Sequence, residues 1–141
     1  MSYETNNDYL LPALDPFEVF DQWYKEVSAK KVDDPTVMTL ATVNKAGRPK
    51  ARTLLLKKYT NKTFTFFTNY DSHKGSEISQ NPFGAVTFFW QGSDYQVRIE
   101  GKIQKSPKKV SDAYFSTRAK ESQLASIASS QSQPIASRQA L

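Results

Sequence analysis

Residues 37–69, VMTLATVNKAGRPKARTLLLKKYTNKTFTFFTN, contain three runs that are typical of β-strands, separated by two short turns. The first run is rich in β-branched residues, and the last alternates threonine with phenylalanine, as half-buried strands do. NKAG and TNK supply the turn residues between the runs, and Gly47 suits a tight turn. Short strands joined by tight turns predict antiparallel pairing, and hence a small β-barrel or a twisted meander.

Further elements are expected on both sides of this segment. Residues 84–90 and 95–105 resemble two more strands, the second with a possible bulge at Gly101. Three helices are predicted, each from a capping residue followed by helical spacing or a helix-ending proline. They cover residues 15–31 with Asp15 as the cap, 72–81 with Ser72, and 106–132 with Ser106. The expected order is a helix, four or five antiparallel strands with a helical insert, then helices.

The chain has 141 residues, which suits one domain with a modest core. We expect an irregular arm over residues 1–14 and a single domain over residues 15–141. The amino terminus lacks a signal-peptide pattern, and no apolar run reaches membrane-spanning length, so no membrane partner and a cytoplasmic location are expected. Cysteine is absent, which excludes disulfides and thiolate chemistry.

Positive charge is concentrated in one part of the sequence. The net charge is +5, but residues 45–74 hold eight Lys or Arg and one acidic residue, whereas residues 1–34 hold eight acidic residues and three Lys. A local positive field favours an anionic partner such as a phosphate, a nucleic acid or an acidic surface. A solvated basic face with no partner is the alternative interpretation.

The residue inventory limits the chemistry that side chains alone can perform. With one histidine and no cysteine, a metal centre is not expected, and no nucleophile motif accompanies His73. A reactive group supplied by a cofactor is therefore favoured. A phosphate on that cofactor would explain Arg52 as a bidentate donor, Lys57 or Lys74 as a point charge, and the helix start at residues 72–74 as an anion site.

One difficulty with this hypothesis is strand geometry. Arg52 and Lys57 are five positions apart, so strict alternation places them on opposite faces of one strand. Either a bulge intervenes or the two cations contact different groups of the ligand. A pair of surface cations remains the alternative.

An ordered set of segments covering roughly residues 15–138 resembles one known family. The set comprises DPFEVFDQW, DPTVMTLATVNKAGRPKARTLLLKKY, FTFFTNYDSHKGSEISQNP, FFW, YQVRIEGKIQK, AYFSTRAKESQ and SSQSQPIASR. In this order they resemble the pyridoxamine 5′-phosphate oxidase family, also called pyridoxal 5′-phosphate synthase. No single segment decides the resemblance; the ordered set is specific.

The resemblance implies a mainly β fold with helices (α+β), the FMN-binding split β-barrel, and a homodimer. It implies that flavin mononucleotide (FMN) accepts a hydride from C4′ of pyridoxamine or pyridoxine 5′-phosphate, giving pyridoxal 5′-phosphate. Dioxygen then reoxidises the flavin, and in the amine case an imine is hydrolysed to release ammonia. It implies no catalytic side chain and no metal.

Site residues follow from the resemblance position by position. Positions matching flavin contacts are Arg52, Thr53, Leu54, Leu55, Lys57, Phe67, Thr68, His73, Lys74, Gln96, Gln131 and Ser132. Gln131 and Ser132 match a pair that reaches the flavin from the partner subunit. Positions matching substrate contacts are Lys57, Tyr114, Arg118 and Ser122, and the last three have spacings that would put them on one helical face.

The chain departs from the family pattern at some places. His73 stands where the family usually has arginine, which predicts a weaker, pH-dependent phosphate contact. The tryptophan-glycine and Arg-x-His motifs of the family's carboxy-terminal portion are absent, so a truncated form is expected. Two alternatives to an oxidase therefore remain. One is a non-catalytic module that binds FMN or a B6 vitamer. The other is a nucleic-acid binder, which is disfavoured because the aromatic residues near the basic segment alternate into an apparent core.

Overall fold

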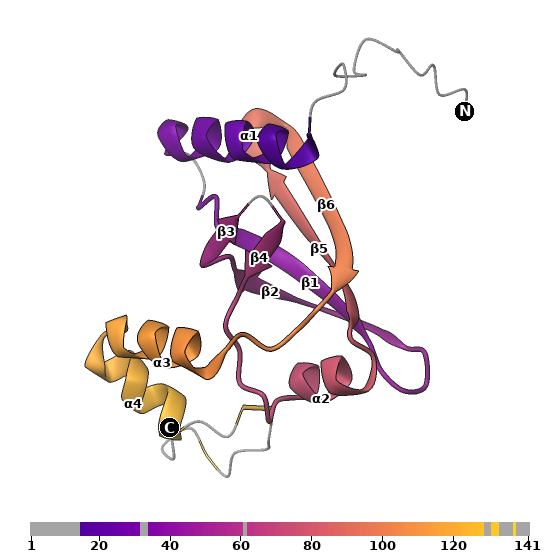
Figure 1. Ribbon diagram of the computed structural model, residues 1–141, viewed down its shortest axis with the longest axis vertical. Coiled ribbons are helices and arrows are strands. Elements are labelled where there is room, and N and C mark those ends of the chain that lie inside the picture. The colour runs from indigo at the N-terminus through magenta and orange to yellow at the C-terminus, as the bar shows by residue number, and fades with distance from the viewer. Residues whose placement is uncertain (1–14, 32–33, 61, 129–130, 133–136, 138–141) are drawn as a thin grey trace.

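The computed structural model describes residues 15–31, 34–60, 62–128, 131–132 and 137. The expected arm over residues 1–14 lies outside these residues. The elements run from the amino-terminal helix at one end of the molecule to the last two helices at the other (Figure 1). In chain order they are α1 (Pro16–Lys30), β1 (Val37–Val43), β2 (Pro49–Leu55), β3 (Lys58–Thr60), β4 (Thr63–Thr65), α2 (His73–Gln80), β5 (Phe83–Trp90), the 3₁₀-helix η2 (Gln91–Ser93), β6 (Tyr95–Lys102), α3 (Lys108–Thr117) and α4 (Lys120–Ala128).

A four-stranded antiparallel sheet in the order β2-β1-β5-β6 forms the centre of the fold, and β3 and β4 form a separate hairpin. The register is continuous, with Ala41 opposite Ala51 on β2 and Ala85 on β5. Gly101 lies opposite Gly84 within this register, so the bulge suggested for Gly101 is not formed. An α+β fold with antiparallel strands is therefore confirmed.

The core lies between one face of the sheet, helix α1 and the β3–β4 hairpin. Phe20 of α1 is its hub: its ring lies 4.9 Å from Phe64 of the hairpin and 5.5 Å from Phe88 of the sheet, between ring centroids. The buried core residues are Phe20, Val27, Met38, Leu40, Leu56, Val86, Phe88 and Trp90. Burying large aromatic rings from three elements is what fixes α1 against the sheet.

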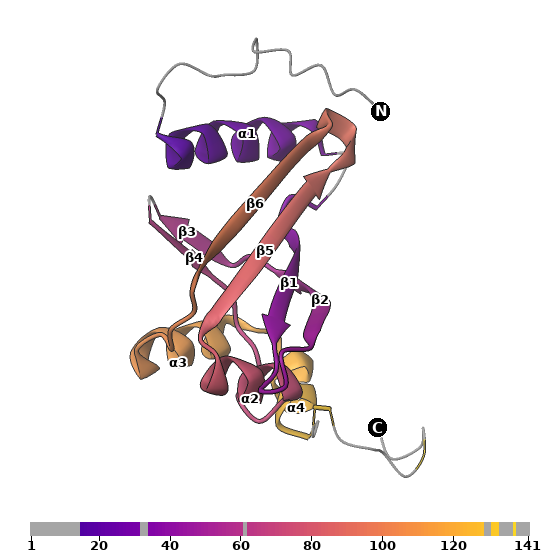
Figure 2. The same ribbon diagram turned by 90° about the vertical axis from the view of Figure 1, so that its right-hand side faces the viewer.

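The opposite face of the sheet carries no described element. In Figure 2, α1 lies across one end of the sheet and the hairpin lies to one side of it. Alternate residues of the four strands point away from this core, and Phe83 and Phe89 are 62% and 60% exposed. We call this surface the open sheet face; its members are Val37, Thr39, Ala41, Val43, Ala51, Thr53, Leu55, Phe83, Ala85, Thr87, Phe89, Gln96, Arg98, Glu100 and Lys102.

Both predicted short-range caps near the first two helices are confirmed. The Asp15 carboxylate accepts a hydrogen bond from the backbone N–H of Phe17 at 2.9 Å, and Pro16 occupies the first turn of α1. Ser72 caps α2 by accepting from the Gly75 backbone N–H. These contacts are local, so they can be predicted from a few neighbouring residues.

The prediction of one helix over residues 106–132 capped by Ser106 is wrong. Pro107 holds the N-cap position of α3 without a side-chain cap, and the helix ends where Arg118 adopts an extended backbone. Just before this break, the Ser116 and Thr117 hydroxyls donate to the carbonyls of residues 113 and 114. Such side-chain bonds compete with helix propagation, so a second helix, α4, begins at Lys120.

Strand lengths were also overestimated. The run over residues 48–59 is interrupted because β2 ends at Leu55 and β3 begins at Lys58, and the alternating run after it pairs only over Thr63–Thr65. The described residues therefore hold six strands instead of four or five. None of the described helices has the length and apolar character needed to cross a bilayer.

Candidate functional site

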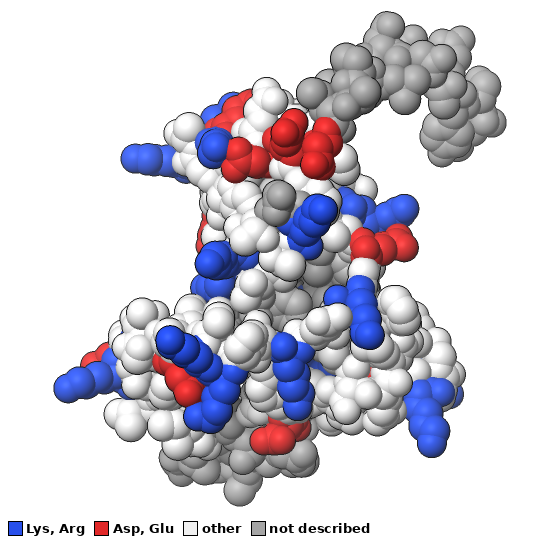
Figure 3. Space-filling model, viewed as in Figure 1, with Lys and Arg blue, Asp and Glu red and all other residues white. Residues whose placement is uncertain are grey.

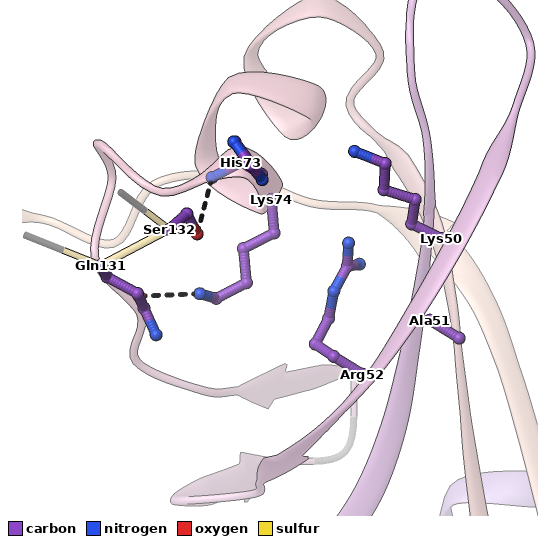
Figure 4. A pocket seen from close by; sticks show the side chains of 7 residues that line it. All are labelled: Lys50, Ala51, Arg52, His73, Lys74, Gln131 and Ser132. Carbon is purple, nitrogen blue, oxygen red and sulfur yellow. Dashed lines mark hydrogen bonds between the residues drawn. The ribbon is translucent and has the colours of Figure 1, made fainter. Parts of the chain in front are cut away.

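An open cavity of about 430 Å³ lies where strand β2 meets the start of helix α2. Figure 4 shows its lining side chains, which come from β2, from α2 and from a short carboxy-terminal segment. The lining residues are Lys50, Ala51, Arg52, His73, Lys74, Gln131 and Ser132. Three Lys or Arg side chains give this cavity a positive potential that favours an anion, and a pocket of this volume can hold a small-molecule group.

Lys74 is a buried cation in this cavity, only 7% exposed. Its ammonium donates to the Ser72 hydroxyl at 3.1 Å and to the Gln131 side-chain carbonyl at 2.9 Å. Burial, together with the nearby charge of Arg52, lowers the pKa of Lys74 from its ordinary value. A cation held with neutral partners and partly stripped of water is suited to binding an anion.

Arg52 enters the same cavity from β2, and Figure 4 shows it between Lys50 and Lys74. Its Nη1 donates to the Thr42 hydroxyl at 2.6 Å and approaches the Leu40 carbonyl at 3.4 Å, and its Nη2 donates to Glu77 at 2.9 Å. The guanidinium side chain is 22% exposed. The guanidinium is therefore held by hydrogen bonds to Thr42 and Glu77 on one side and remains accessible from the cavity.

Glu77 is a buried carboxylate that joins α2 to the sheet. Its Oε2 accepts from the Thr42 hydroxyl at 2.5 Å and from Arg52, and its Oε1 lies 3.0 Å from the Lys50 ammonium. Burial by itself raises the pKa of Glu77, but the hydrogen bonds from Thr42, Lys50 and Arg52 outweigh burial and lower the pKa to about 2. Glu77 is therefore ionised throughout the physiological range.

This depressed pKa predicts an acid-dependent stability. The folded pKa of about 2 lies below the ordinary value of 4.5, so the stabilisation is complete above about pH 4.5 and is lost as the pH falls towards 2. On the order of 3 kcal/mol of folding free energy is involved, at about 1.4 kcal/mol for each pKa unit. We expect the urea midpoint of the wild-type chain to fall over this pH range, and that of Glu77→Gln to fall less steeply.

Comparing the wild-type chain with Glu77→Gln isolates the contribution of Glu77 to the pH dependence of stability. Asp21, Glu26 and Asp34 also have lowered pKa values from their hydrogen-bond partners, but these carboxylates are present in both chains and cancel. Identical slopes of urea midpoint against pH in the two chains would contradict the assignment.

Two further features lie along the segment that joins β4 to α2. The Thr68 hydroxyl oxygen is buried and has no hydrogen-bond partner in the part of the chain that the structure describes. The neighbouring Phe67 ring stacks on Tyr114 of α3, with centroids 3.9 Å apart and planes within 2°. An unpartnered buried hydroxyl is costly unless something else bonds it, so Thr68 is available to a ligand.

The structure brings together some of the sequence-predicted flavin residues. Arg52, His73, Lys74, Gln131 and Ser132 share the cavity, and the backbone N–H of His73 donates to the Ser132 hydroxyl at 3.4 Å. Gln131 and Ser132 thus contact His73 and Lys74 of their own chain, whereas the resemblance implied an approach from a partner subunit. Their contact with a flavin stays a prediction.

Other flavin-matching residues lie elsewhere. Thr53 and Leu55 are on the open sheet face, while Leu54 points to the core side. Gln96 is exposed on β6, opposite Phe89. Lys57 lies beyond the end of β2, where its backbone N–H donates to Thr65, so the question of strand alternation with Arg52 does not arise.

The three residues matched to the substrate phosphate do not line the cavity. Tyr114 lies in α3, Arg118 at the break after it, and Ser122 in α4. The prediction that they share one helical face is wrong, because the helix is interrupted at Arg118. Arg118 instead donates to the Ser126 hydroxyl at 2.5 Å.

Sequence reasoning missed Thr42, Lys50 and Glu77. The signal was present in part: Thr42 lies opposite Lys50 in the strand register, and Glu77 is one helical turn after Lys74. Which face of α2 meets which strand depends on packing between distant segments, so the sequence did not reveal it. Within the described residues, no group of three or more His, Cys, Asp or Glu is arranged to hold a metal ion.

A model of the family described as pyridoxamine 5′-phosphate oxidase matches residues 25–141. The chain belongs to this family. It is 47% identical over 127 residues to pyridoxine/pyridoxamine 5′-phosphate oxidase 1 of Hydrogenovibrio crunogenus, covering 90% of this chain and 59% of that protein. It is 49% identical over 123 residues to the pyridoxine/pyridoxamine 5′-phosphate oxidase of Bordetella pertussis, covering 87% and 59%.

A longer match is found with the pyridoxine/pyridoxamine 5′-phosphate oxidase of Paraburkholderia phytofirmans, at 43% identity over 145 residues, covering 98% of this chain and 68% of that protein. Several other members of the family are matched over about the same length as the first two. The chain therefore spans about 59% of the length of the Hydrogenovibrio and Bordetella relatives.

Solved structures show the same fold. PhzG from Burkholderia lata, solved with tetrahydrophenazine-1-carboxylic acid, matches with a TM-score of 0.86 at 22% identity, over 99% of this chain and 68% of that one. A pyridoxamine 5′-phosphate oxidase-related, FMN-binding protein from Nostoc punctiforme matches with a TM-score of 0.70 at 21% identity, over 92% and 72%. The predicted α+β, split-barrel-like fold is confirmed by these likenesses.

Proposed function

We propose that this chain binds FMN and takes part in the oxidation of pyridoxamine or pyridoxine 5′-phosphate to pyridoxal 5′-phosphate, with dioxygen as electron acceptor. The observation that carries the proposal is the convergence of Arg52 and Lys74 in one cavity at the start of α2, in a chain of this family. The bound flavin would supply the hydride acceptor, which no side chain of the protein provides.

The residues present fit the phosphate of FMN. Arg52 can offer two parallel N–H groups, Lys74 a buried charge, and the start of α2 the positive end of its helix dipole. The unpartnered Thr68 hydroxyl would bond another polar atom of the flavin. The other proposed flavin contacts are Thr53, Leu54, Leu55, Lys57, Phe67, His73, Gln96, Gln131 and Ser132; the proposed substrate contacts are Lys57, Tyr114, Arg118 and Ser122.

The test is purification of the 141-residue chain with FMN, followed by an absorbance spectrum and an assay of pyridoxal 5′-phosphate formation. We expect bound flavin in the visible spectrum and turnover of the amine or alcohol substrate. A folded chain that shows neither would contradict the proposal.

A second candidate is a non-catalytic module that binds FMN or a B6 vitamer. It is favoured by the position of Tyr114, Arg118 and Ser122, none of which lines the cavity. In this case flavin would bind and no pyridoxal 5′-phosphate would form. Rapid oxidation of pyridoxamine 5′-phosphate by the purified chain would exclude this candidate.

We also propose that the chain forms a homodimer through the open sheet face. Ala41, Ala51 and Ala85 lie side by side across three strands, so the centre of this face carries only methyl side chains and a second sheet can approach it closely. Phe83 and Phe89 on the same face leave large apolar rings in water in the single chain. A second copy would cover them, and burial of such apolar surface drives association.

A charge at the centre of this face is expected to prevent association. In Ala41→Glu, the carboxylate would have to be desolvated between two sheets, which costs far more than the alanine contact contributes. We expect the wild-type chain to have the mass of a dimer in light scattering and Ala41→Glu that of a monomer. Ala46→Glu, in the exposed turn between β1 and β2, is the matched control and should remain dimeric.

Either of two outcomes would contradict the interface: a wild-type mass of one chain at micromolar concentration, or a dimer in Ala41→Glu.

We further propose that residues 15–141 form one domain and that the protein works in the cytoplasm. A single protease-resistant fragment and a cytosolic fraction in cell fractionation are the expected results.

A further inference from the structure

A buried carboxylate lies directly behind the cations of the cavity, and no part of the proposed phosphate contact uses it. Glu77 is one helical turn after Lys74 and points from α2 to β1 and β2, where Thr42 and Arg52 both donate to its Oε2. Its Oε1 pairs with Lys50, and its side chain is 6% exposed. Both strands and the helix are joined at this one group.

We propose that Glu77 is the positioning residue of the phosphate site, holding Arg52 in the orientation in which its free N–H groups face the cavity. This inference rests on the proposed function, in which the cavity receives the phosphate of FMN. Glu77 acts through Arg52 and does not touch the phosphate.

The hydrogen bonds of Arg52 support this role. Glu77 accepts a hydrogen bond from Nη2 and Thr42 accepts one from Nη1, so the end of the guanidinium is held by two acceptors, and the Thr42 hydroxyl in turn donates to Glu77. The Nε–H and the second N–H of Nη2 have no hydrogen-bond partner within the described residues. These two groups lie on one edge of the guanidinium, which is the edge that binds two oxygens of a phosphate.

The charges around the cavity also match a phosphate. Lys50, Arg52 and Lys74 contribute three positive charges, and Glu77 removes one of them. A phosphate monoester carries about −1.5 to −2 at neutral pH, so the balance suits this ligand class.

Removing Glu77 has two effects on the affinity of the cavity for phosphate, and these effects have opposite signs. The loss of one negative charge makes the cavity more positive, which by Coulomb attraction alone strengthens anion binding. The loss of the acceptor frees Arg52 to leave its bidentate orientation, which weakens binding. We expect the loss of orientation to outweigh the gain in charge, so that binding is weaker overall. Solvent and salt screen the charge effect in an open cavity, whereas a bidentate pair depends on the orientation of Arg52.

The first experiment compares FMN with riboflavin, which lacks the phosphate, by flavin fluorescence titration of wild type and Glu77→Gln. We expect the FMN Kd to rise about tenfold in the variant, and the riboflavin Kd to stay unchanged. Glu18→Gln, an exposed glutamate on α1 with the same chemical change, is the control and should alter neither Kd. Tighter FMN binding, or an equal loss for both ligands, would overturn the positioning role.

A second variant covers the case in which Glu77→Gln does not fold. Thr42→Val keeps the shape of the buried side chain but removes the hydroxyl that bridges Arg52 and Glu77. We expect a smaller rise in the FMN Kd, about threefold, again with no change for riboflavin. No selective loss of FMN affinity would count against the proposal.

A readout without flavin separates this proposal from the proposed function. In nitrogen-15 NMR spectra, the Nε–H signal of Arg52, assigned by its disappearance in Arg52→Lys, is titrated with inorganic phosphate. We expect a sharp signal that shifts with phosphate in wild type, and a broadened signal with little shift in Thr42→Val and Glu77→Gln. A wild-type chain that binds neither flavin would contradict the proposed function alone, while identical phosphate shifts in all three chains would overturn the role of Glu77.

Discussion

Arg52→Ala is expected to raise the Kd for FMN about a hundredfold, the largest effect of any substitution at the cavity. Arg52 is the cation that can donate two parallel N–H groups to one phosphate, and each charge-assisted hydrogen bond contributes about 1.5–3 kcal/mol. Since about 1.4 kcal/mol corresponds to a factor of ten in affinity, two lost bonds account for a hundredfold change. Fluorescence titration with FMN and with riboflavin measures the effect.

The matched control is Lys62→Ala, which removes one positive charge from an exposed turn before β4. We expect its FMN Kd to stay within a factor of two of the wild-type value. The FMN Kd of Arg52→Lys should lie between those of Arg52→Ala and Lys62→Ala, about tenfold above the wild-type value. Lysine keeps the positive charge but cannot donate two parallel N–H groups. Equal Kd values for Arg52→Ala and Lys62→Ala would show that Arg52 does not contact the phosphate.

Phe20→Ala is expected to lower the free energy of unfolding by about 3–5 kcal/mol. The Phe20 ring packs against aromatic rings of α1, the hairpin and the sheet, so its removal leaves a cavity that these elements cannot close together. This loss is a large share of the stability of a typical domain. Urea unfolding followed by tryptophan fluorescence gives the free energy directly.

Leu124→Ala is the comparison for this prediction, because Leu124 is a large apolar residue at an exposed position of α4. We expect a change of less than about 0.5 kcal/mol, as for most surface substitutions. The fraction of Phe20→Ala that stays folded should bind FMN normally, since the cavity includes the start of α2, and α2 lies at the end of the molecule opposite α1 (Figure 1). Similar losses in both variants would mean that Phe20 is not the hub of the core.

Local patterns predicted much of the fold. The caps of α1 and α2 and the strands of the central sheet follow from neighbouring residues, because capping, turn formation and alternation act over a few positions. The break at Arg118 was missed because it depends on side-chain bonds that compete with helical spacing. The early ends of β2, β4 and β6 were missed because strand length depends on how far a partner strand extends.

The charge pattern was informative but coarse. The basic segment over residues 45–74 indicated an anion site, and the structure places Arg52 and Lys74 from that segment in one cavity. Figure 3 shows Lys and Arg side chains spread over the visible face, and among the described residues three of the chain's 19 Lys and Arg line the cavity, so most of the positive charge lies outside it. Counting charges along the chain therefore could not separate site cations from surface cations.

By itself, the sequence determined the α+β class and the family and predicted an anionic ligand, because ordered segments, periodicity and charge are properties of the chain in one dimension. Only the tertiary structure decided that Glu77 reaches across from α2 to hold Arg52 and Lys50, and that Tyr114, Arg118 and Ser122 do not share a face. These outcomes depend on which surfaces of distant elements meet, and burial of the aromatic core settles that arrangement for the molecule as a whole.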